Sequence, residues 1–382
     1  MLLILWLNSF IFLDAYKLDS GISSHRSSHR SSHRSGLYDQ IAEIFQLSSK
    51  DTNFLESQFD LNSLELIYPK SLERLRQMKR CVLGTKFKKK KSKMAAIKLE
   101  FDKSVRAKYD RSTRLINCNY KSIKGEPTEK YIATLTQNRS NFIKFYSSIS
   151  RQFGGDSDGG GGRKKVNMYV YARLAKSENL LQWSEKKRHR LDQAEKFYRK
   201  HFYSIHQALS ELKKEGFIYT DFKPENVLID TVKDRAYLID LESVVSSKSK
   251  FVCLRTVAYT PPLFTRDGKY IDSDGLSSRS IGQFFAGKHL KHPQDRILSW
   301  TFCFSIYSLM CTRGTEIFSP EFQSKYKHWS ADNYPFMSYF GCANGQPSKM
   351  FTDLINGCLV KVAKKPIFDR LIKHPWLANK IN

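Results

Sequence analysis

Four side chains near the middle of the chain are of the types that phosphoryl transfer requires. Asp221, Lys223 and Asn226 lie close together in the segment Tyr-Thr-Asp-Phe-Lys-Pro-Glu-Asn, and Asp240 follows at the end of an apolar run. A carboxylate can orient a hydroxyl group, an ammonium group can offset phosphate charge, and amide and carboxylate oxygens can hold Mg²⁺. The spacing therefore predicts a site that moves a phosphoryl group.

The pattern D-x-K-x-x-N by itself could also be a solvated turn. The residues around it argue against that alternative. Val227–Ile229 is typical of a strand, a hairpin-like turn follows over 231–235, and a second apolar strand leads into Asp240. Strand, turn and strand in this order favour a built site over a chance match.

The elements that would position these groups lie on both sides of the motif. Strands are predicted over 81–87 and 94–99, with the basic turn 88–93 between them, and a further strand over 167–174. The glycine-rich segment 154–162 is interpreted as an insertion between two strands, because no lysine-serine pair follows it. Apolar periodicity predicts a long helix over 191–213.

These segments together resemble protein kinases, whose catalytic loop reads H-R-D-x-K-x-x-N, over residues 64–378. The resemblance implies an α+β, bilobal protein kinase-like fold. A small β-rich N-lobe is expected over 64–171 and a larger, mainly helical C-lobe over 172–382. It also implies ATP and Mg²⁺ as cofactors and a protein substrate.

The resemblance also implies a role for each group in the catalytic loop. Asp221 would orient the substrate hydroxyl and Lys223 would stabilise the transferring charge, while Asn226 and Asp240 would hold Mg²⁺. Lysine two residues after the aspartate is the serine/threonine-type arrangement. Asp295 would brace the catalytic loop from behind.

Further nucleotide contacts are implied for the N-lobe and the hinge. Met94–Leu99 resembles the V-A-I-K strand, so Lys98 would bind phosphate, although one more surface lysine is the simpler interpretation. Glu129 would pair with Lys98, with Glu126 as the competing candidate and an insertion over 106–125. Adenine would contact the hinge strand, whose three candidate residues are Ala172, at the back pocket, Arg173 and Leu174.

Several details are similar to the secreted rhoptry kinases of apicomplexans. Tyr-Thr-Asp, which ends at Asp221, resembles their H-T-D motif, and Asp-Leu-Glu, which begins at Asp240, resembles their D-F-E motif. Ala-Arg-Leu-Ala, which begins at Ala172, resembles their P-R-A hinge, and Leu-Met-Cys, which ends at Cys311, resembles the end of their cysteine-ended helix. This resemblance implies a secreted serine/threonine kinase of the rhoptry, delivered to the host cell or the parasitophorous vacuole.

The chain departs from the kinase pattern in its phosphate loop. Gly84 is the only glycine between Leu64 and Lys98, so no G-x-G-x-x-G is present, as in with-no-glycine-loop and FIKK kinases. Nucleotide binding is the step this departure affects. The alternative function is therefore a catalytically inactive pseudokinase that acts as a partner- or membrane-binding scaffold. Thr220 replaces the arginine that reads an activation-loop phosphate, which predicts activity without such phosphorylation.

The net charge of the chain indicates what kind of partner it binds, and the N-terminal residues indicate how the chain is processed. A formal charge of +27 and a pI near 9.7 favour acidic partners. No zinc-finger spacing and no RNA-binding motif occur, so nucleic acid is not expected as a partner. The apolar residues 1–16 are interpreted as a signal peptide, with a buried helix as the alternative, and 37–63 as an N-terminal extension.

Residues 17–36 contain three Ser-Ser-His-Arg repeats and are expected to be a linker. If they were helical, Arg26, Arg30 and Arg34 would share a face suited to an anionic membrane surface. The chain has seven cysteines. In a secreted chain, bridges are expected among the four nearest the C-terminus, which are Cys303, Cys311, Cys342 and Cys358.

Overall fold

The chain forms two compact units in a computed structural model. The structure describes residues 33–47, 49–78, 80–89, 93–101, 122–123, 125–153, 164–186, 191–248, 256, 259, 293–312, 315–329, 334–360 and 368–378. One unit, here called the sheet unit, takes its described residues from 1–105 and 143–175, and the other, the helical unit, from 106–142 and 176–382. The expected signal peptide over 1–16, and Arg26 and Arg30, lie outside the described residues.

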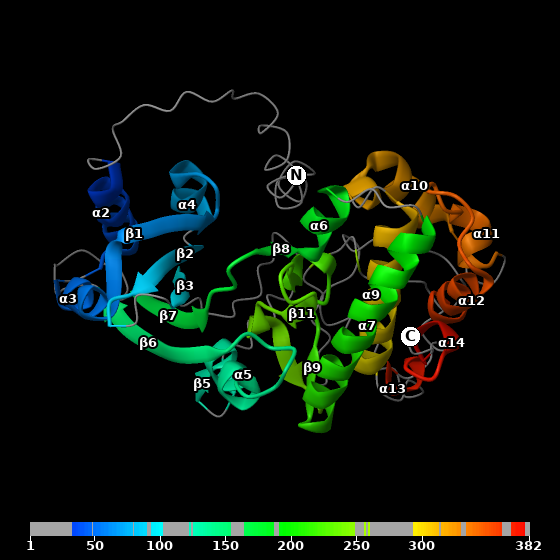
Figure 1. Cartoon of the computed structure of the whole chain (residues 1–382). Coiled ribbons are helices and arrows are strands. Elements are labelled where there is room, and N and C mark those ends of the chain that lie inside the picture. Colours follow the sequence, from blue (N-terminus) through cyan, green and yellow to red (C-terminus); the bar gives the residue numbers. More distant parts are fainter. Residues whose placement is uncertain are drawn as a thin grey trace. The chain divides into compact units, whose positions relative to one another are not determined.

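The sheet unit is built on five antiparallel strands in the order β1-β2-β3-β7-β6 (Figure 1). Their bounds are Phe59–Tyr68 for β1, Arg80–Phe87 for β2, Met94–Phe101 for β3, Phe145–Phe153 for β6 and Lys164–Ala172 for β7. The strands predicted over 81–87 and 94–99 are confirmed. β7 ends at Ala172, two residues before the predicted end at 174, and Ala175 is the last residue of the sheet unit.

The register of the strands gives this sheet one apolar and one polar face. Leu83 lies opposite Ile97, which lies opposite Val170, and all three side chains are buried in the core. One residue further along β3, Lys98 lies between Val82 of β2 and Tyr169 of β7, and all three side chains project from the other face. Successive side chains of a strand point to opposite faces, so one face holds the core and the other carries the charged groups.

Three helices complete the core of the sheet unit. They are α2 (His33–Phe45), α3 (Ser49–Gln58) and α4 (Leu72–Met78), and each contributes an apolar side chain to the core, among them Phe45, Leu55 and Leu75. α2 begins at His33, inside the segment 17–36 that was expected to be a linker. Because helix growth is cooperative, the turns that bury Ile41 and Phe45 extend the helix back through Arg34.

The expected N-lobe boundary at residue 64 falls inside β1. The strand starts at Phe59, and its pairing with β2 shifts register between Asp60 and Glu65. That irregularity breaks the alternation of apolar residues by which a strand is recognised in a sequence. The extension over 37–63 is therefore part of the sheet unit and supplies one of its edge strands.

Long helices dominate the other unit. α7 (Leu191–Lys214) confirms the helix predicted over 191–213, and it contacts α9 (Pro293–Cys311). Shorter helices surround α9 in Figure 1. They are α10 (Pro320–His328), α11 (Phe336–Phe340), α12 (Lys349–Cys358), α13 (Phe368–Leu371) and α14 (Pro375–Ala378), preceded by the 3₁₀ turn η4 (Thr315–Phe318).

Small elements of the helical unit hold the loops that carry the predicted catalytic groups. β10 (Val227–Asp230) pairs with β11 (Arg235–Leu238) and with β8 (Ser177–Asn179), and β9 (Phe217–Tyr219) pairs with β12 (Val244–Ser246). The same unit also contains β4 (Ser122–Ile123), β5 (Glu126–Pro127), α5 (Thr128–Thr136) and α6 (Leu180–Lys186).

Two disulfides join α9 to the segments that surround it. Cys303 is bonded to Cys358 of α12, and Cys311 is bonded to Cys342, just after α11. The expectation of bridges among these four cysteines is confirmed, and the structure adds the pairing. Cys81 of β2 is buried and free.

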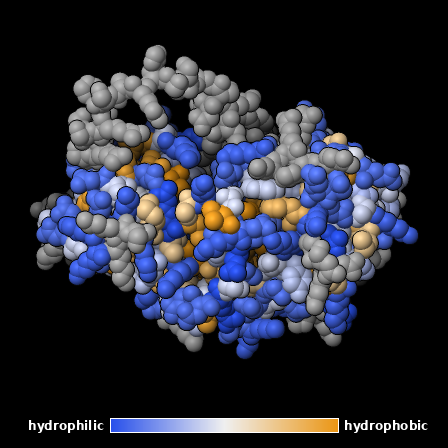
Figure 2. Space-filling model, viewed as in Figure 1, coloured by the Kyte–Doolittle hydropathy of each residue, from blue (hydrophilic) through white to orange (hydrophobic). Residues whose placement is uncertain are grey.

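The hydropathy of the described surface and helices is relevant to membrane contact. Hydrophilic residues cover most of the described surface on the face in Figure 2. Among the described helices, none combines the length and the apolar character needed to cross a bilayer.

Candidate active site

Asp221 is the second residue of the loop that connects β9 to β10. Its side chain is buried, and a 3₁₀ turn over Pro224–Asn226 (η1) completes the loop. The Asn226 side-chain Nδ2 donates to the main-chain oxygen of Asp221 at 2.9 Å. Because the amide nitrogen is used in this bond, Oδ1 is the atom that Asn226 can present to a metal ion.

Lys223 and Thr256 both contact the Asp221 carboxylate. Lys223 Nζ lies 3.1 Å from Asp221 Oδ2, and it donates to Thr256 Oγ1 at 2.8 Å. The Thr256 hydroxyl in turn donates to Asp221 Oδ1 at 2.7 Å. Burial opposes the positive charge of Lys223, but the nearby carboxylates, Asp221 first, outweigh burial and raise the pKa of the amine. Lys223 therefore stays charged beside the carboxylate.

Thr256 is a site residue that the sequence did not reveal. It lies in the run Thr-Val-Ala-Tyr over 256–259, and nothing in that run assigns a role to its hydroxyl. The contact with Asp221 joins residues 35 positions apart. Only the fold brings them together.

Tyr219 and Thr220 tie the catalytic loop to the segment that carries Asp240. The Tyr219 hydroxyl donates to the main-chain oxygen of Ile239 at 2.7 Å, and the Thr220 hydroxyl donates to that of Ser243 at 2.6 Å. Burial, with added repulsion from Asp240 and Asp221, raises the pKa of Tyr219 well above its usual value. The phenol therefore remains a donor and holds the two loops in fixed register.

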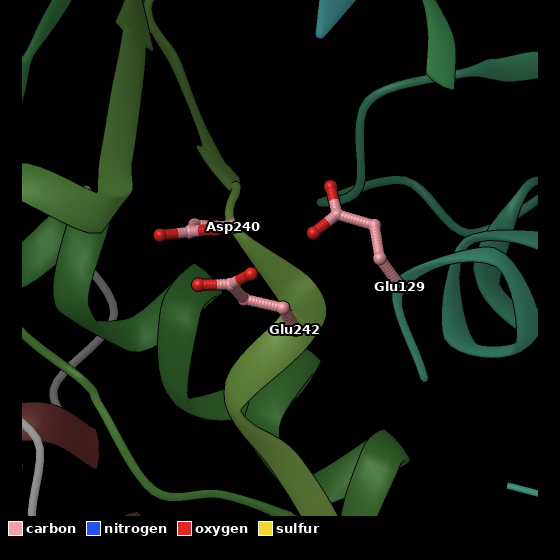
Figure 3. A group of neighbouring side chains, drawn as sticks. All are labelled: Glu129, Asp240 and Glu242. Carbon is pink, nitrogen blue, oxygen red and sulfur yellow. The ribbon is translucent and has the colours of Figure 1, made fainter. Parts of the chain in front are cut away.

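Asp240 lies with two other carboxylates. It has left-handed backbone angles (φ 60°, ψ 54°) and immediately precedes the 3₁₀ turn η2 (Leu241–Ser243), which carries Glu242. Carboxylate oxygens of Glu129, Asp240 and Glu242 all lie within 4.8 Å of one another. In Figure 3 the Glu129 carboxylate, from α5, is directed toward the segment that carries the other two.

The donor set around Asp240 fits a Mg²⁺ ion. Oxygen ligands from carboxylates and an amide are those that Mg²⁺ prefers, and Asn226, whose Nδ2 donates to Asp221 O, would contribute Oδ1. Carboxylates this close together repel one another unless positive charge lies among them. Asn226 and Asp240 were the predicted ligands, whereas Glu242 was not predicted as one.

Glu129 and Glu126 differ in their surroundings. Glu129 is buried near the start of α5, whereas Glu126 lies in β5 and pairs with Lys130 at 2.7 Å in a half-exposed contact. Lys98 belongs to the sheet unit and Glu129 to the helical unit. Their pairing stays a prediction.

Lys98 lies on the polar face of the sheet, next to a second buried charge. Its Nζ is 3.5 Å from Glu100 Oε2, with side chains 7% and 9% exposed. Arg80, the first residue of β2, approaches the same Glu100 oxygen at 3.7 Å. Lys98 is therefore a buried, paired residue, not one of the many surface lysines.

The predicted hinge residues lie at the end of β7. Ala172 N–H donates to Lys144 O at 2.8 Å, and Arg173 N–H donates to Met94 O at 3.1 Å. The Arg173 guanidinium pairs with Glu65 and crosses Gly84, where an added Cβ would lie 2.9 Å from Arg173 Cζ. Glycine at position 84 leaves room for this arginine. Leu174 follows as irregular chain.

Asp295 does not brace the catalytic loop as expected. Its carboxylate accepts from Phe368 N–H at 3.0 Å and pairs with Lys213 at 2.5 Å. Asp295 thus connects α9 with the end of α7 and the start of α13. The buried carboxylate uses one oxygen for each of these partners, which explains the difference.

Comparison with known proteins identifies a family. A family model described as protein kinase domain matches residues 85–377. Among solved structures, that of the Cydia pomonella granulovirus kinase PK-1 is similar, at 15% identity and a TM-score of 0.47, covering 86% of this chain and 100% of that one. No curated protein matches the sequence.

Proposed function

The chain belongs to the protein kinase domain family, and from that premise we propose that it is an active serine/threonine kinase that uses ATP and Mg²⁺. The sheet unit and the helical unit would correspond to the N-lobe and the C-lobe of the kinase fold. They differ from the predicted lobes, because the described residues of 106–142, predicted for the N-lobe, belong to the helical unit. The rest of this proposal depends on the site residues.

The contact among Asp221, Lys223 and Thr256 supports catalysis most strongly. A buried carboxylate held by one ammonium group and one hydroxyl has a defined rotamer, which suits it to orient a substrate hydroxyl for attack. Lys223 lies at the same carboxylate and would offset charge on the transferring phosphoryl group. A scaffold without catalysis would have no need of this arrangement.

The remaining groups bind the nucleotide. Asn226 and Asp240, the latter with Glu242 and Glu129 beside it, would hold Mg²⁺, which neutralises phosphate charge when bound. Lys98, supported by Glu100, would contact the phosphates, and β7 would lead into the adenine contact near Ala172 and Arg173.

Transfer of labelled phosphate from ATP to a generic protein substrate tests the proposal. Asp221→Asn should lower the rate by about 10²-fold or more, because it removes the group that orients the hydroxyl. Asp353→Asn, on an exposed site of α12, is the matched control and should behave as wild type. Label on phosphoserine or phosphothreonine supports the proposed specificity, and label on phosphotyrosine alone contradicts it.

The second candidate function is a pseudokinase that scaffolds a partner or a membrane. It is favoured by the connection between β1 and β2, which carries α4 where a glycine-rich loop is expected. A thermal-shift titration with Mg²⁺-ATP distinguishes the two functions. Absence of any ATP-dependent shift, together with absence of transfer, supports the scaffold.

Secretion and a rhoptry-kinase affiliation are part of the proposal. Two disulfides and the apolar N-terminal run support an oxidising compartment. N-terminal sequencing of the protein recovered from its native cell tests the signal peptide: a start close to residue 17 supports cleavage, and a start at Met1 contradicts it. Flotation with vesicles of anionic lipid, comparing wild type with a triple Gln variant of Arg26, Arg30 and Arg34, tests the proposed membrane contact.

A further inference from the structure

The connection between β1 and β2, where a kinase has its glycine-rich loop, contains no glycine. The 69–79 connection between β1 and β2 contains α4 instead. In its first turn, Leu75 N–H donates to Ser71 O at 3.1 Å and Arg74 N–H donates to Ser71 Oγ at 3.3 Å. These main-chain donors are used within the helix. Side chains must therefore supply the positive charge that the loop would otherwise provide.

Arg80 is the first residue after this connection and lies on the polar face of the sheet. In the pairing of β2 with β3, Arg80 lies opposite Glu100, and Val82 lies opposite Lys98. Since alternate residues of a strand share a face, Arg80, Lys98 and Glu100 all project from the same side. This is the face that carries Lys98, the predicted phosphate-binding lysine.

Glu100 holds both cations. Arg80 Nε is 3.7 Å and Lys98 Nζ is 3.5 Å from the same oxygen, Glu100 Oε2. Lys98 and Glu100 are almost fully buried, while the Arg80 side chain is 22% exposed. Arg80 is the more accessible of the two cations.

We propose that Arg80 is a phosphate-binding residue that, together with Lys98, replaces the glycine-rich loop. The inference rests on the proposed function, because it assumes that ATP binds on the polar face. The planar guanidinium group can bind two phosphate oxygens at once, and it is charged at every pH of interest. Glu100 is a positioning residue that keeps both cations on the polar face before the nucleotide arrives.

Binding measurements that compare ATP with adenosine test this inference. Isothermal titration of the full chain with each ligand, in the presence of Mg²⁺, gives two dissociation constants for wild type. Arg80→Gln should weaken ATP by about tenfold or more, the usual effect of losing a hydrogen bond to a charged group, and leave adenosine unchanged. Arg80→Lys should weaken ATP by a smaller factor, because it keeps the charge and loses the two-pronged contact.

Arg235→Gln is the matched control, since Arg235 also opens a strand but is exposed in the helical unit. It should bind both ligands as wild type does. Where Arg80→Gln fails to fold, Arg80→Lys decides the question by the same comparison. Equal affinities of wild type and the Arg80 variants for ATP would overturn the inference while leaving the kinase proposal intact. Failure of wild type to bind ATP at all would instead refute the proposed function.

Discussion

Thr256 donates a hydrogen bond to the Asp221 carboxylate across 2.7 Å. The same hydroxyl accepts from Lys223 at 2.8 Å, so one threonine holds both catalytic-loop groups. The rotamer of Asp221 therefore depends on a segment that lies 35 residues away in the chain. The position of Thr256 therefore helps to fix the orientation of the Asp221 carboxylate.

Replacement of Thr256 by valine should lower kcat/KM by about tenfold or more. The substitution keeps the shape of the side chain and removes a hydrogen bond to a charged group, which typically contributes about 1.5–3 kcal/mol. Thr256→Ser should retain most of the activity, because the hydroxyl remains. Steady-state kinetics on a protein substrate makes the measurement, and a valine variant as active as wild type would show that the contact is not needed.

Activity should not require phosphorylation of the activation segment. Thr220 stands where an arginine would read the phosphate, and its hydroxyl is already bonded to Ser243 O in a buried position. A neutral, buried side chain cannot form the charge-assisted bonds that such a phosphate needs. Protein treated with phosphatase should therefore transfer phosphate within about twofold of the untreated rate. A severalfold rise upon phosphorylation between residues 243 and 260 would refute the prediction.

Metal affinity should depend on Asp240 and, to a smaller extent, on Glu242. Asp240→Asn and Glu242→Gln each remove a negative charge from the trio that includes Glu129. We expect about a tenfold or larger loss of Mn²⁺ affinity for the Asp240 variant. Electron paramagnetic resonance of bound and free Mn²⁺ measures this affinity. Glu126→Gln, in the exposed pair with Lys130, is the control and should bind Mn²⁺ as wild type does. Unchanged affinity in the Asp240 variant would place the metal elsewhere.

Each disulfide should stabilise the helical unit by about 2–4 kcal/mol. The Cys303–Cys358 bridge closes a loop of 55 residues and Cys311–Cys342 one of 31, and both restrict the unfolded chain. Cys303→Ala with Cys358→Ala should lower the guanidinium midpoint under oxidising conditions. Dithiothreitol should destabilise wild type more than this double variant, which keeps only one bridge. Equal effects of the reductant on both proteins would show that the 303–358 bridge contributes nothing.

Mild acid should destabilise the helical unit through His201. Burial, partly opposed by Asp234, lowers the pKa of His201 from 6.5 to about 4. The unfolded chain therefore takes up a proton near pH 6.5 that the folded state refuses until about pH 4, so stability falls as the pH drops through that window. Between pH 7 and pH 5 this one group should cost about 2 kcal/mol.

Urea unfolding at pH 7 and pH 5 measures this loss. The His201→Gln variant should lose less stability than wild type over that interval, because it has no group to protonate. His328→Gln, at an exposed site of α10, should lose as much as wild type. Identical losses in wild type and His201→Gln would contradict the assignment.

Local patterns account for the parts that the sequence predicted correctly. The strand that carries Lys98 and the long helix beginning at Leu191 follow from the spacing of their apolar residues. The loop from Asp221 to Asn226 is closed by a hydrogen bond between residues only five apart. Interactions of such short range depend on the types of neighbouring residues. The sequence by itself therefore determined where these helices and strands lie and how the central motif is arranged.

The tertiary structure alone decided which distant side chains meet. It brought Thr256 to Asp221, set Glu242 beside Glu129, placed Arg80 against Glu100 and paired the four bridging cysteines. It also gave the Asp295 carboxylate Phe368 N–H and Lys213 as partners. Each of these contacts depends on how strands register and helices pack across long stretches of chain, and local residue patterns carry no information about that geometry.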